Sequence, residues 1–216
     1  MDAPRPSTVA GTPANSLLLV IAAPSGAGKT TLVHRLLAAR PNLVRAVTCT
    51  TRAPRRGEQD GQDYYFFSPA EFERRLAAGE FLEHALVYGN HYGVLRRELL
   101  GKLRQGRDVL LNVDVQGCAT MRAQAQADPE LGRALVMIFL TPASRSVLEQ
   151  RLRQRGTDSE EIIARRLAVA RQEVAQWVHF DYLLISTTID EDLRRALVLV
   201  EAEKMRQGRA QAPEDF

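Results

Sequence analysis

The sequence predicts an α/β fold of three layers, with a parallel sheet between helices, an inserted small mixed β/α lobe and a helical lid. Four apolar runs have the length of strands that are buried on both faces, which is typical of a parallel sheet. These runs are residues 17–21, 108–114, 134–140 and 182–186. Segments with helical periodicity or capping signals alternate with them. Two stretches interrupt this alternation, an aromatic and polar one at 48–96 and an arginine-rich one at 142–178, and we expect them to form the lobe and the lid.

The first apolar run leads into a phosphate-binding loop, or P-loop. The pattern is G-x-x-x-x-G-K-[ST], with Ala23 where the first glycine belongs. Gly26 and Gly28 allow successive backbone N–H groups to turn toward an anion, and the N-terminus of the next helix adds further donors. Lys29 can then reach the β- and γ-phosphates, and the Thr30 hydroxyl can hold Mg²⁺. The predicted triphosphate-binding residues are Ala23, Pro24, Ser25, Gly26, Ala27, Gly28, Lys29, Thr30 and Thr31.

The alternative interpretation of this loop is a glycine-rich turn with a solvated lysine. A predicted strand before the loop and a predicted helix after it favour the nucleotide site. The loop alone does not indicate the second substrate.

Length, charge and cysteine content narrow the class of protein. The 216 residues, 45% of them hydrophobic, suffice for one domain with inserted lobes. A net charge of +3, from 29 basic and 26 acidic residues, is too even to indicate nucleic-acid binding, and we expect none. Cys49 and Cys118 lack the spacing of a zinc site or a disulfide framework, so we expect small buried side chains.

The two ends of the chain have the composition of disordered segments. Residues 1–15 are rich in Pro, Ala, Ser and Thr and lack the apolar run of a signal peptide, which predicts a disordered leader. Residues 207–216 are expected to form a flexible tail. Because no segment approaches the length of a membrane span, we expect a cytoplasmic protein without membrane association.

The expected lobe and lid each carry a cluster of cations. A polar loop in the lobe holds Arg52, Arg55 and Arg56, and its place near a P-loop makes a second anion site plausible beside the alternative of solvated surface. In the lid, two arginine-rich helices joined at Gly156 can close over phosphates, with a solvated basic hairpin as an equal alternative on this pattern. Trp177 is expected to pack as core at the end of the second lid helix.

Asp114 ends the second apolar run. A carboxylate at the carboxyl end of a strand beside a P-loop can help to organise Mg²⁺, which is the interpretation we favour. The alternative is an aspartate that caps the following turn.

Six motifs agree in one register with a known family. They are Thr50-Thr51-Arg52-Ala53-Pro54-Arg55-Arg56-Gly57-Glu58, Gly61-Gln62-Asp63-Tyr64-Tyr65-Phe66, Gly79-Glu80-Phe81-Leu82-Glu83, Tyr88-Gly89-Asn90-His91-Tyr92-Gly93, Asp114-Val115-Gln116-Gly117 and Arg155-Gly156-Thr157. On these motifs the chain resembles guanylate kinase over about residues 16–205. The resemblance implies Mg²⁺-dependent phosphoryl transfer from ATP to GMP or dGMP, giving ADP and GDP, in purine nucleotide metabolism.

The resemblance also implies roles for individual residues. The implied GMP-binding residues are Thr48, Arg52, Arg55, Tyr64, Glu83, Tyr92 and Asp114, and the implied catalytic residues are Lys29, Arg52, Asp114, Arg155 and Arg166. The implied parts of the domain are a core at 16–47, 97–141 and 179–206, a GMP-binding lobe at 48–96 and a lid at 142–178. Glu83 would accept two parallel hydrogen bonds from guanine N1–H and the 2-amino group. Adenine has no such pair of donors, so AMP would leave the carboxylate unpaired.

Four positions depart from the family pattern. They are Ala23 in the P-loop, Val94 where relatives have Ser or Thr, Asn112 where a carboxylate is frequent, and Ser186-Thr187-Thr188 near the expected adenine site. Two other functions therefore stay open, a non-catalytic module that binds phosphorylated peptides and a kinase for another nucleoside monophosphate. A homodimer is also left open.

Overall fold

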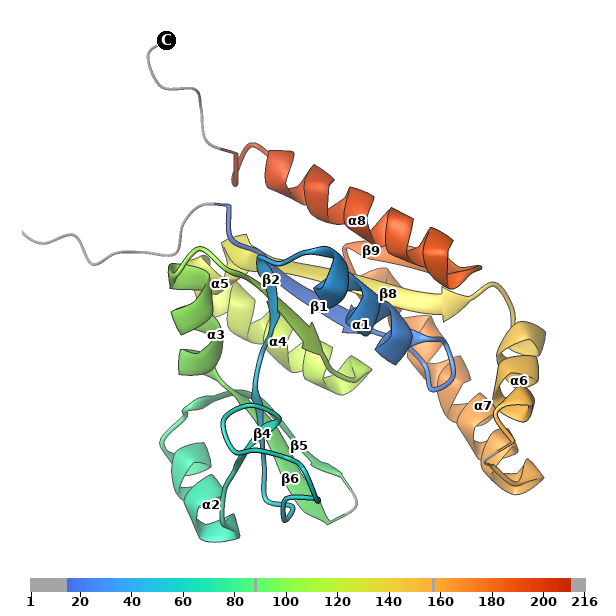
Figure 1. Cartoon of the computed structure of the whole chain (residues 1–216), viewed down its shortest axis with the longest axis horizontal. Coiled ribbons are helices and arrows are strands. Elements are labelled where there is room, and N and C mark those ends of the chain that lie inside the picture. Colours follow the sequence, from blue (N-terminus) through green and yellow to red (C-terminus); the bar gives the residue numbers. More distant parts are fainter. Residues whose placement is uncertain (1–14, 88, 157, 211–216) are drawn as a thin grey trace, which may run out of the picture.

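The computed structural model describes residues 15–87, 89–156 and 158–210, and its centre is a five-stranded parallel sheet (Figure 1). The strand order is β2-β7-β1-β8-β9. The strands are β1 (Leu18–Ala22), β2 (Leu43–Arg45), β7 (Asp108–Asn112), β8 (Leu135–Pro142) and β9 (Tyr182–Ser186). All residues of β1 are buried, because strands flank it on both sides and helices cover both faces. The predicted α/β fold with a parallel sheet is confirmed.

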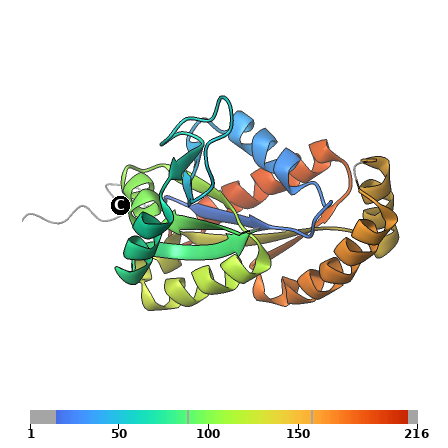
Figure 2. The ribbon, with the colours of Figure 1, turned by 90° about the horizontal axis from the view of Figure 1, so that it is seen from below.

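Helices on both faces of this sheet complete three layers (Figure 2). Leu19 and Ile21 of β1 share a buried cluster with α1 and α8 on one face. Leu18 and Val20 point to the opposite face and share a cluster with α3, α4 and α5. These helices are α1 (Lys29–Ala39), α3 (Arg96–Arg104), α4 (Val115–Ala127), α5 (Pro129–Ala134) and α8 (Ile189–Met205).

A second, smaller sheet lies beside the core with its own apolar cluster. Its strand order is β4-β3-β6-β5, with parallel and antiparallel pairs. The elements are β3 (Thr48–Thr50), β4 (Tyr64–Phe66), α2 (Pro69–Ala77), β5 (Phe81–Val87) and β6 (Asn90–Leu95). Phe72 of α2 and Phe81 of β5 stack with ring centroids 4.3 Å apart. The buried, free Cys49 packs in the same cluster, and Cys118 is buried in the core, as predicted.

Two helices, α6 (Arg145–Gln154) and α7 (Glu160–Val174), form the arginine-rich segment, and the 3₁₀ helix η1 (Ala175–His179) follows them. Figure 1 shows them on the far side of the core from the smaller sheet. Leu148 and Leu152 of α6 pack on Ile163 and Leu167 of α7 in a separate cluster. The pair is therefore a unit with its own apolar contacts.

Two local expectations are wrong, and two helices were not predicted. Helices α4 and α5 have no counterpart in the prediction, because an Ala- and Gln-rich run has weak apolar periodicity; Asp114 and Asp128 cap them. The apolar and β-branched residues at 44–48 predict one short strand, which is wrong because β2 belongs to the parallel sheet and β3 to the smaller one. Trp177 is 44% exposed, because η1 places it on the rim of a groove between α7 and β9 and not in the core.

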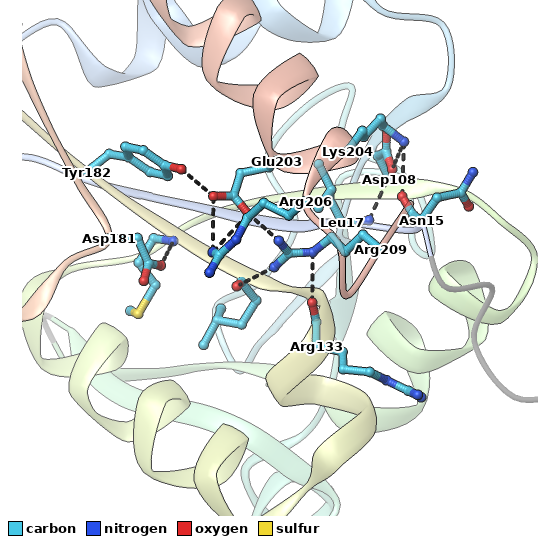
Figure 3. Close-up of polar contacts among 12 residues, drawn as sticks. Asn15, Leu17, Asp108, Arg133, Asp181, Tyr182, Glu203, Lys204, Arg206 and Arg209 are labelled. Carbon is cyan, nitrogen blue, oxygen red and sulfur yellow. Dashed lines mark hydrogen bonds and ion pairs between the residues drawn. The ribbon is translucent and has the colours of Figure 1, made fainter. Parts of the chain in front are cut away.

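The C-terminal boundary also needs a correction. Residues 1–14 and 211–216 lie outside the described part of the chain, so the predicted leader and most of the predicted tail are not described. Within the predicted tail, however, Arg209 is only 6% exposed. It pairs with the buried Glu203 and donates to the carbonyls of Arg133 and Leu135 at the start of β8 (Figure 3). The packed domain therefore continues past residue 206, because an ion pair with Glu203 and hydrogen bonds to the distant carbonyls of Arg133 and Leu135 hold Arg209.

Replacing Arg209 with methionine should lower the free energy of unfolding by about 3 kcal/mol. The fully buried Glu203 carboxylate then loses the buried guanidinium that pairs with it. The matched control is Arg206→Met, which removes a guanidinium that also pairs with Glu203 but is 64% exposed, and should cost less than about 1 kcal/mol. Urea unfolding monitored by circular dichroism measures both losses. Equal losses in the two variants would contradict this account.

Candidate active site

The P-loop has the geometry of an anion cradle. Gly26 and Gly28 have φ of 95° and 99°, a region that other residues rarely adopt, and Gly28 caps α1 without a side-chain hydrogen bond. The N-terminal N–H groups of α1 are therefore directed at whatever binds in the loop. Ala23 is buried in the cluster under α1, so the core accommodates its methyl group. The departure from the glycine pattern is thus absorbed by packing.

Lys29 lies between the carboxyl ends of two neighbouring strands. Its Nζ donates to the Val113 carbonyl oxygen at 3.1 Å, one residue after the end of β7. Burial lowers the pKa of Lys29, while Cys118, Asp114 and Glu173 oppose this shift. The ammonium is thus desolvated and held at the end of the P-loop, where a phosphate would compensate its charge.

Asp114 combines the two interpretations of its sequence position. Its Oδ1 accepts the N–H of Gly117 at 2.8 Å and so caps α4, which is the alternative interpretation. Its side chain also lines a cavity of about 240 Å³ beside the smaller sheet. The cap holds the carboxylate at the cavity wall, so the structural role does not exclude a functional one.

That cavity brings together most of the residues implied for the acceptor nucleotide. Thr48, Tyr64, Glu83, Tyr92 and Asp114 line it. They come from strands β3, β4, β5 and β6 and from the cap of α4. Because these elements are separated along the chain, no local sequence pattern predicts that their side chains meet. Asn112 and Val94, two of the departures from the family pattern, line it as well.

Glu83 is the most perturbed carboxyl of the cavity. It is 7% exposed, and burial, with a smaller contribution from Asp114, raises its pKa to about 7. A shift of this kind is typical of functional sites, because burial disfavours the charged form of a carboxyl unless a bound partner compensates for it.

Arg52 lies next to this cavity. Its guanidinium makes a bidentate pair with Glu58, at 2.8 and 3.0 Å, and lies 5.5 Å from the centroid of the Tyr64 ring. Glu58 also accepts the backbone N–H of Arg55 at 2.7 Å, which closes the loop between them. The side chain of Arg55 belongs to the exposed part of this loop. The loop therefore places the Arg52 guanidinium beside Tyr64, and Arg55 is an exposed cation of the same loop.

The lid arginines reach the P-loop to different degrees. Arg166 donates to the Ser25 hydroxyl at 3.3 Å and pairs with Asp158 at 3.1 Å. Arg155 is exposed at the C-terminal cap of α6. The P-loop and the lid are therefore in contact through Arg166, which supports a role for this arginine at the phosphates.

Arg151 is a site residue that the sequence analysis missed. Its guanidinium donates to the carbonyl of Ala27 in the P-loop at 3.1 Å, to Ser186 Oγ at 3.0 Å and to the carbonyl of Thr187 at 3.1 Å. The available signal was its position four residues before Arg155, one helical turn away on the same face. Arg151 thus joins the lid, the P-loop and the segment after β9.

The residues present fit a hard cation with few protein ligands. Among the described residues, no group of three His, Cys, Asp or Glu could hold a metal. Mg²⁺ at phosphates takes one or two protein oxygens with water and phosphate oxygens, and the exposed Thr30 hydroxyl in the first turn of α1 supplies one. Within the same part of the chain, no helix has the length and apolarity to cross a bilayer.

A P-loop at the start of α1, a half-buried lysine and an arginine-rich helical pair beside a three-layer α/β core define a P-loop kinase. Comparison with known proteins narrows this class. The family model described as guanylate kinase matches residues 15–203. The chain belongs to the guanylate kinase family.

Individual relatives agree over most of their length. The chain is 43% identical over 200 residues to the guanylate kinase of Cereibacter sphaeroides, covering 93% of this chain and 92% of that one. It is 39% identical over 220 residues to the guanylate kinase of Novosphingobium aromaticivorans, covering 96% and 97%. The crystal structure of guanylate kinase from Anaplasma phagocytophilum superposes with a TM-score of 0.67 at 33% identity, covering 90% of this chain and 89% of the other.

Proposed function

We propose that this chain transfers the γ-phosphoryl group of ATP to GMP, giving ADP and GDP. One observation of the acceptor site supports this proposal independently of family membership. A buried carboxyl, Glu83, lines a cavity with Thr48 and Asp114, and its burial raises its pKa, so a bound partner with hydrogen-bond donors would stabilise the ionised form. Guanine supplies that partner, because N1–H and the 2-amino group form two parallel donors.

On the acceptor side, the proposed base site continues into a phosphate site. Tyr64 and Tyr92 line the cavity, and Arg52 lies over the Tyr64 ring. Two hydroxyls and the guanidinium of Arg52, with Arg55 on the same loop, would bind the phosphate of GMP by charge-assisted hydrogen bonds. The base and the phosphate of one nucleotide would therefore be held by different walls of one site.

On the donor side, the P-loop N–H groups and Lys29 would hold the triphosphate. Thr30 would be the protein ligand of Mg²⁺, which neutralises phosphate charge when it is bound. Arg151, Arg155 and Arg166 would place positive charge where negative charge develops on the phosphate oxygens during transfer. The lid would also exclude water, which competes with GMP for the phosphoryl group.

The test is a coupled assay of ADP release with ATP and Mg²⁺. We expect turnover that requires GMP and is at least about a hundredfold weaker with AMP or UMP. Absence of ADP release with every acceptor would contradict the proposal and favour the non-catalytic module, and release that requires AMP or UMP instead of GMP would favour another acceptor. Assay with dGMP tests the proposed tolerance of the deoxynucleotide.

The kcat/KM for GMP should rise with pH between 6 and 8. Guanine requires the ionised form of Glu83, whose pKa in the free enzyme is raised to about 7. The ionised fraction, and with it kcat/KM, should therefore increase about tenfold over this range. The control is Glu83→Gln, whose residual kcat/KM reports only the titration of the substrate phosphate. An unmutated enzyme that follows the same profile as this variant would contradict the role of Glu83.

The remaining expectations stay predictions. They include the division into core, lobe and lid, a cytoplasmic location, a homodimer and the absence of nucleic-acid binding. Size-exclusion chromatography with light scattering tests the oligomeric state.

A further inference from the structure

The direction of the Glu83 side chain depends on an irregularity in β5. Pairing with β6 shifts by one residue between Phe81 and Glu83, as in a β-bulge. Three consecutive residues, Phe81, Leu82 and Glu83, are buried, although side chains in a regular strand alternate between faces. The bulge turns Glu83 toward α4, on which β5 packs.

At α4 the carboxyl of Glu83 meets Gly117. A Cβ built on Gly117 would lie 3.0 Å from Oε1 and 3.1 Å from both Cδ and Cγ of Glu83, where ordinary contacts begin near 3.4 Å. A side chain at position 117 would therefore require the Glu83 carboxyl group to move away from α4 by a few tenths of an ångström.

No backbone reason explains a glycine at this position. Gly117 is absent from the glycines with positive φ, so alanine could adopt the same backbone conformation. Glycine inside a helix is less favourable than alanine by about 0.5–1 kcal/mol. The close approach of Glu83 is the feature that favours glycine here.

We propose that Gly117 is a specificity-determining position of the acceptor site, because the missing side chain sets the place of the Glu83 carboxylate and so the selection of guanine over hypoxanthine. Gly117 acts through Glu83 and is a positioning residue. Both carboxylate oxygens are needed for the two parallel bonds to guanine, whereas hypoxanthine lacks the 2-amino group and offers one of them. A displaced Oε1 therefore weakens the binding of GMP more than that of IMP. The inference rests on the proposed function.

Two other glycines define the experiment. A Cβ at Gly93 would lie 2.7 Å from the Phe81 ring and 3.0 Å from the Glu83 backbone oxygen, so substitution there disturbs the smaller sheet itself. A Cβ at Gly101, inside α3, would meet nothing within 4 Å. Gly101→Ala is thus the matched control for Gly117→Ala.

The experiment measures kcat/KM for GMP and IMP, and KM for ATP, in Gly117→Ala, Gly117→Val and Gly101→Ala. We expect kcat/KM for GMP to fall about tenfold with alanine and about a hundredfold with valine, since small displacements of a binding group have large effects. The ratio of GMP to IMP activity should fall at least about fivefold, with KM for ATP unchanged within about twofold. Gly101→Ala should change none of these by more than about twofold. Thermal unfolding of Gly117→Ala should match or exceed that of the unmutated protein, which separates repositioning from loss of structure.

A double-substitution cycle identifies the route of the effect. In a Glu83→Ala background, Gly117→Ala should change kcat/KM for GMP by less than about twofold, because the displaced group is gone. An unchanged GMP-to-IMP ratio in Gly117→Ala, or an undiminished effect in the Glu83→Ala background, would overturn the inference while leaving the proposed function in place. Absence of GMP turnover in the unmutated protein would instead overturn the proposed function.

Discussion

Replacing Lys29 with methionine should lower kcat by about three orders of magnitude, because in the proposed function the ammonium is the P-loop cation that would reach the transferred phosphate. Methionine keeps the length and apolar stem of lysine but removes the charge. The Nζ of Lys29 donates to the Val113 carbonyl at the end of β7, and no other side chain of residues 23–31 carries a charge that could replace it. The loss should appear in kcat more than in KM for GMP.

The same substitution should leave the fold intact. Burial disfavours the charged form of Lys29 in the free protein and lowers its pKa, so methionine removes an unfavourable desolvation together with one hydrogen bond. The melting temperature should therefore stay within about 3 °C of the unmutated value. Lys102→Met is the matched control, since Lys102 pairs with Glu98 on α3 away from the P-loop, and its kcat should be unchanged within about twofold. A kcat near normal in Lys29→Met would refute the assignment of the donor site.

Replacing Glu83 with glutamine should lower kcat/KM for GMP by at least about a hundredfold, with much less change in KM for ATP. The amide presents one acceptor and one donor, so one of the two hydrogen bonds to guanine becomes a repulsive contact between donors. Discrimination between GMP and AMP should fall in the same variant. Equal losses for GMP and ATP would show that Glu83 supports the structure and does not recognise the base.

The Glu83→Gln variant should also be more stable than the unmutated protein at neutral pH. The pKa of Glu83 is raised from 4.5 to about 7 in the folded state, so the folded protein binds more protons than the unfolded chain between these values. Stability therefore declines as pH rises from 4.5 to 7 and stays reduced above 7. The variant lacks this decline and should gain about 1–2 kcal/mol at pH 8, with little difference at pH 4.5. Urea unfolding at the two pH values measures the difference, and a variant less stable than the parent at pH 8 would contradict it.

The donor half of the site could be predicted because it is local. Residues 23–31 form one continuous loop between a strand and a helix, and the geometry of the loop depends on its own glycines. The apolar runs likewise predict the parallel sheet, since strands buried on both faces leave a distinct pattern. The caps at Ser68, Ser144 and Ser159 lie where capping residues precede helices, because capping is also a contact over three residues.

The elements that escaped prediction depend on distant partners. Helix α4 has weak periodicity of its own and is stabilised by packing on β1 and β5. In the sequence, Arg151 cannot be distinguished from the other arginines of α6 and α7. Its contacts with Ala27 of the P-loop and with Ser186 exist only in the folded chain. Arg209 reads as part of a frayed end, although Glu203 and the start of β8 hold it.

By itself, the sequence determined the nucleotide-binding loop, the class of fold and, through its motifs, the family. Only the tertiary structure decided the environment of Glu83. The motif around Glu83 names a carboxylate but not its burial, its raised pKa or its approach to Gly117. Those properties arise where β5, β6 and α4 meet, and a contact between segments more than thirty residues apart leaves no local pattern to read.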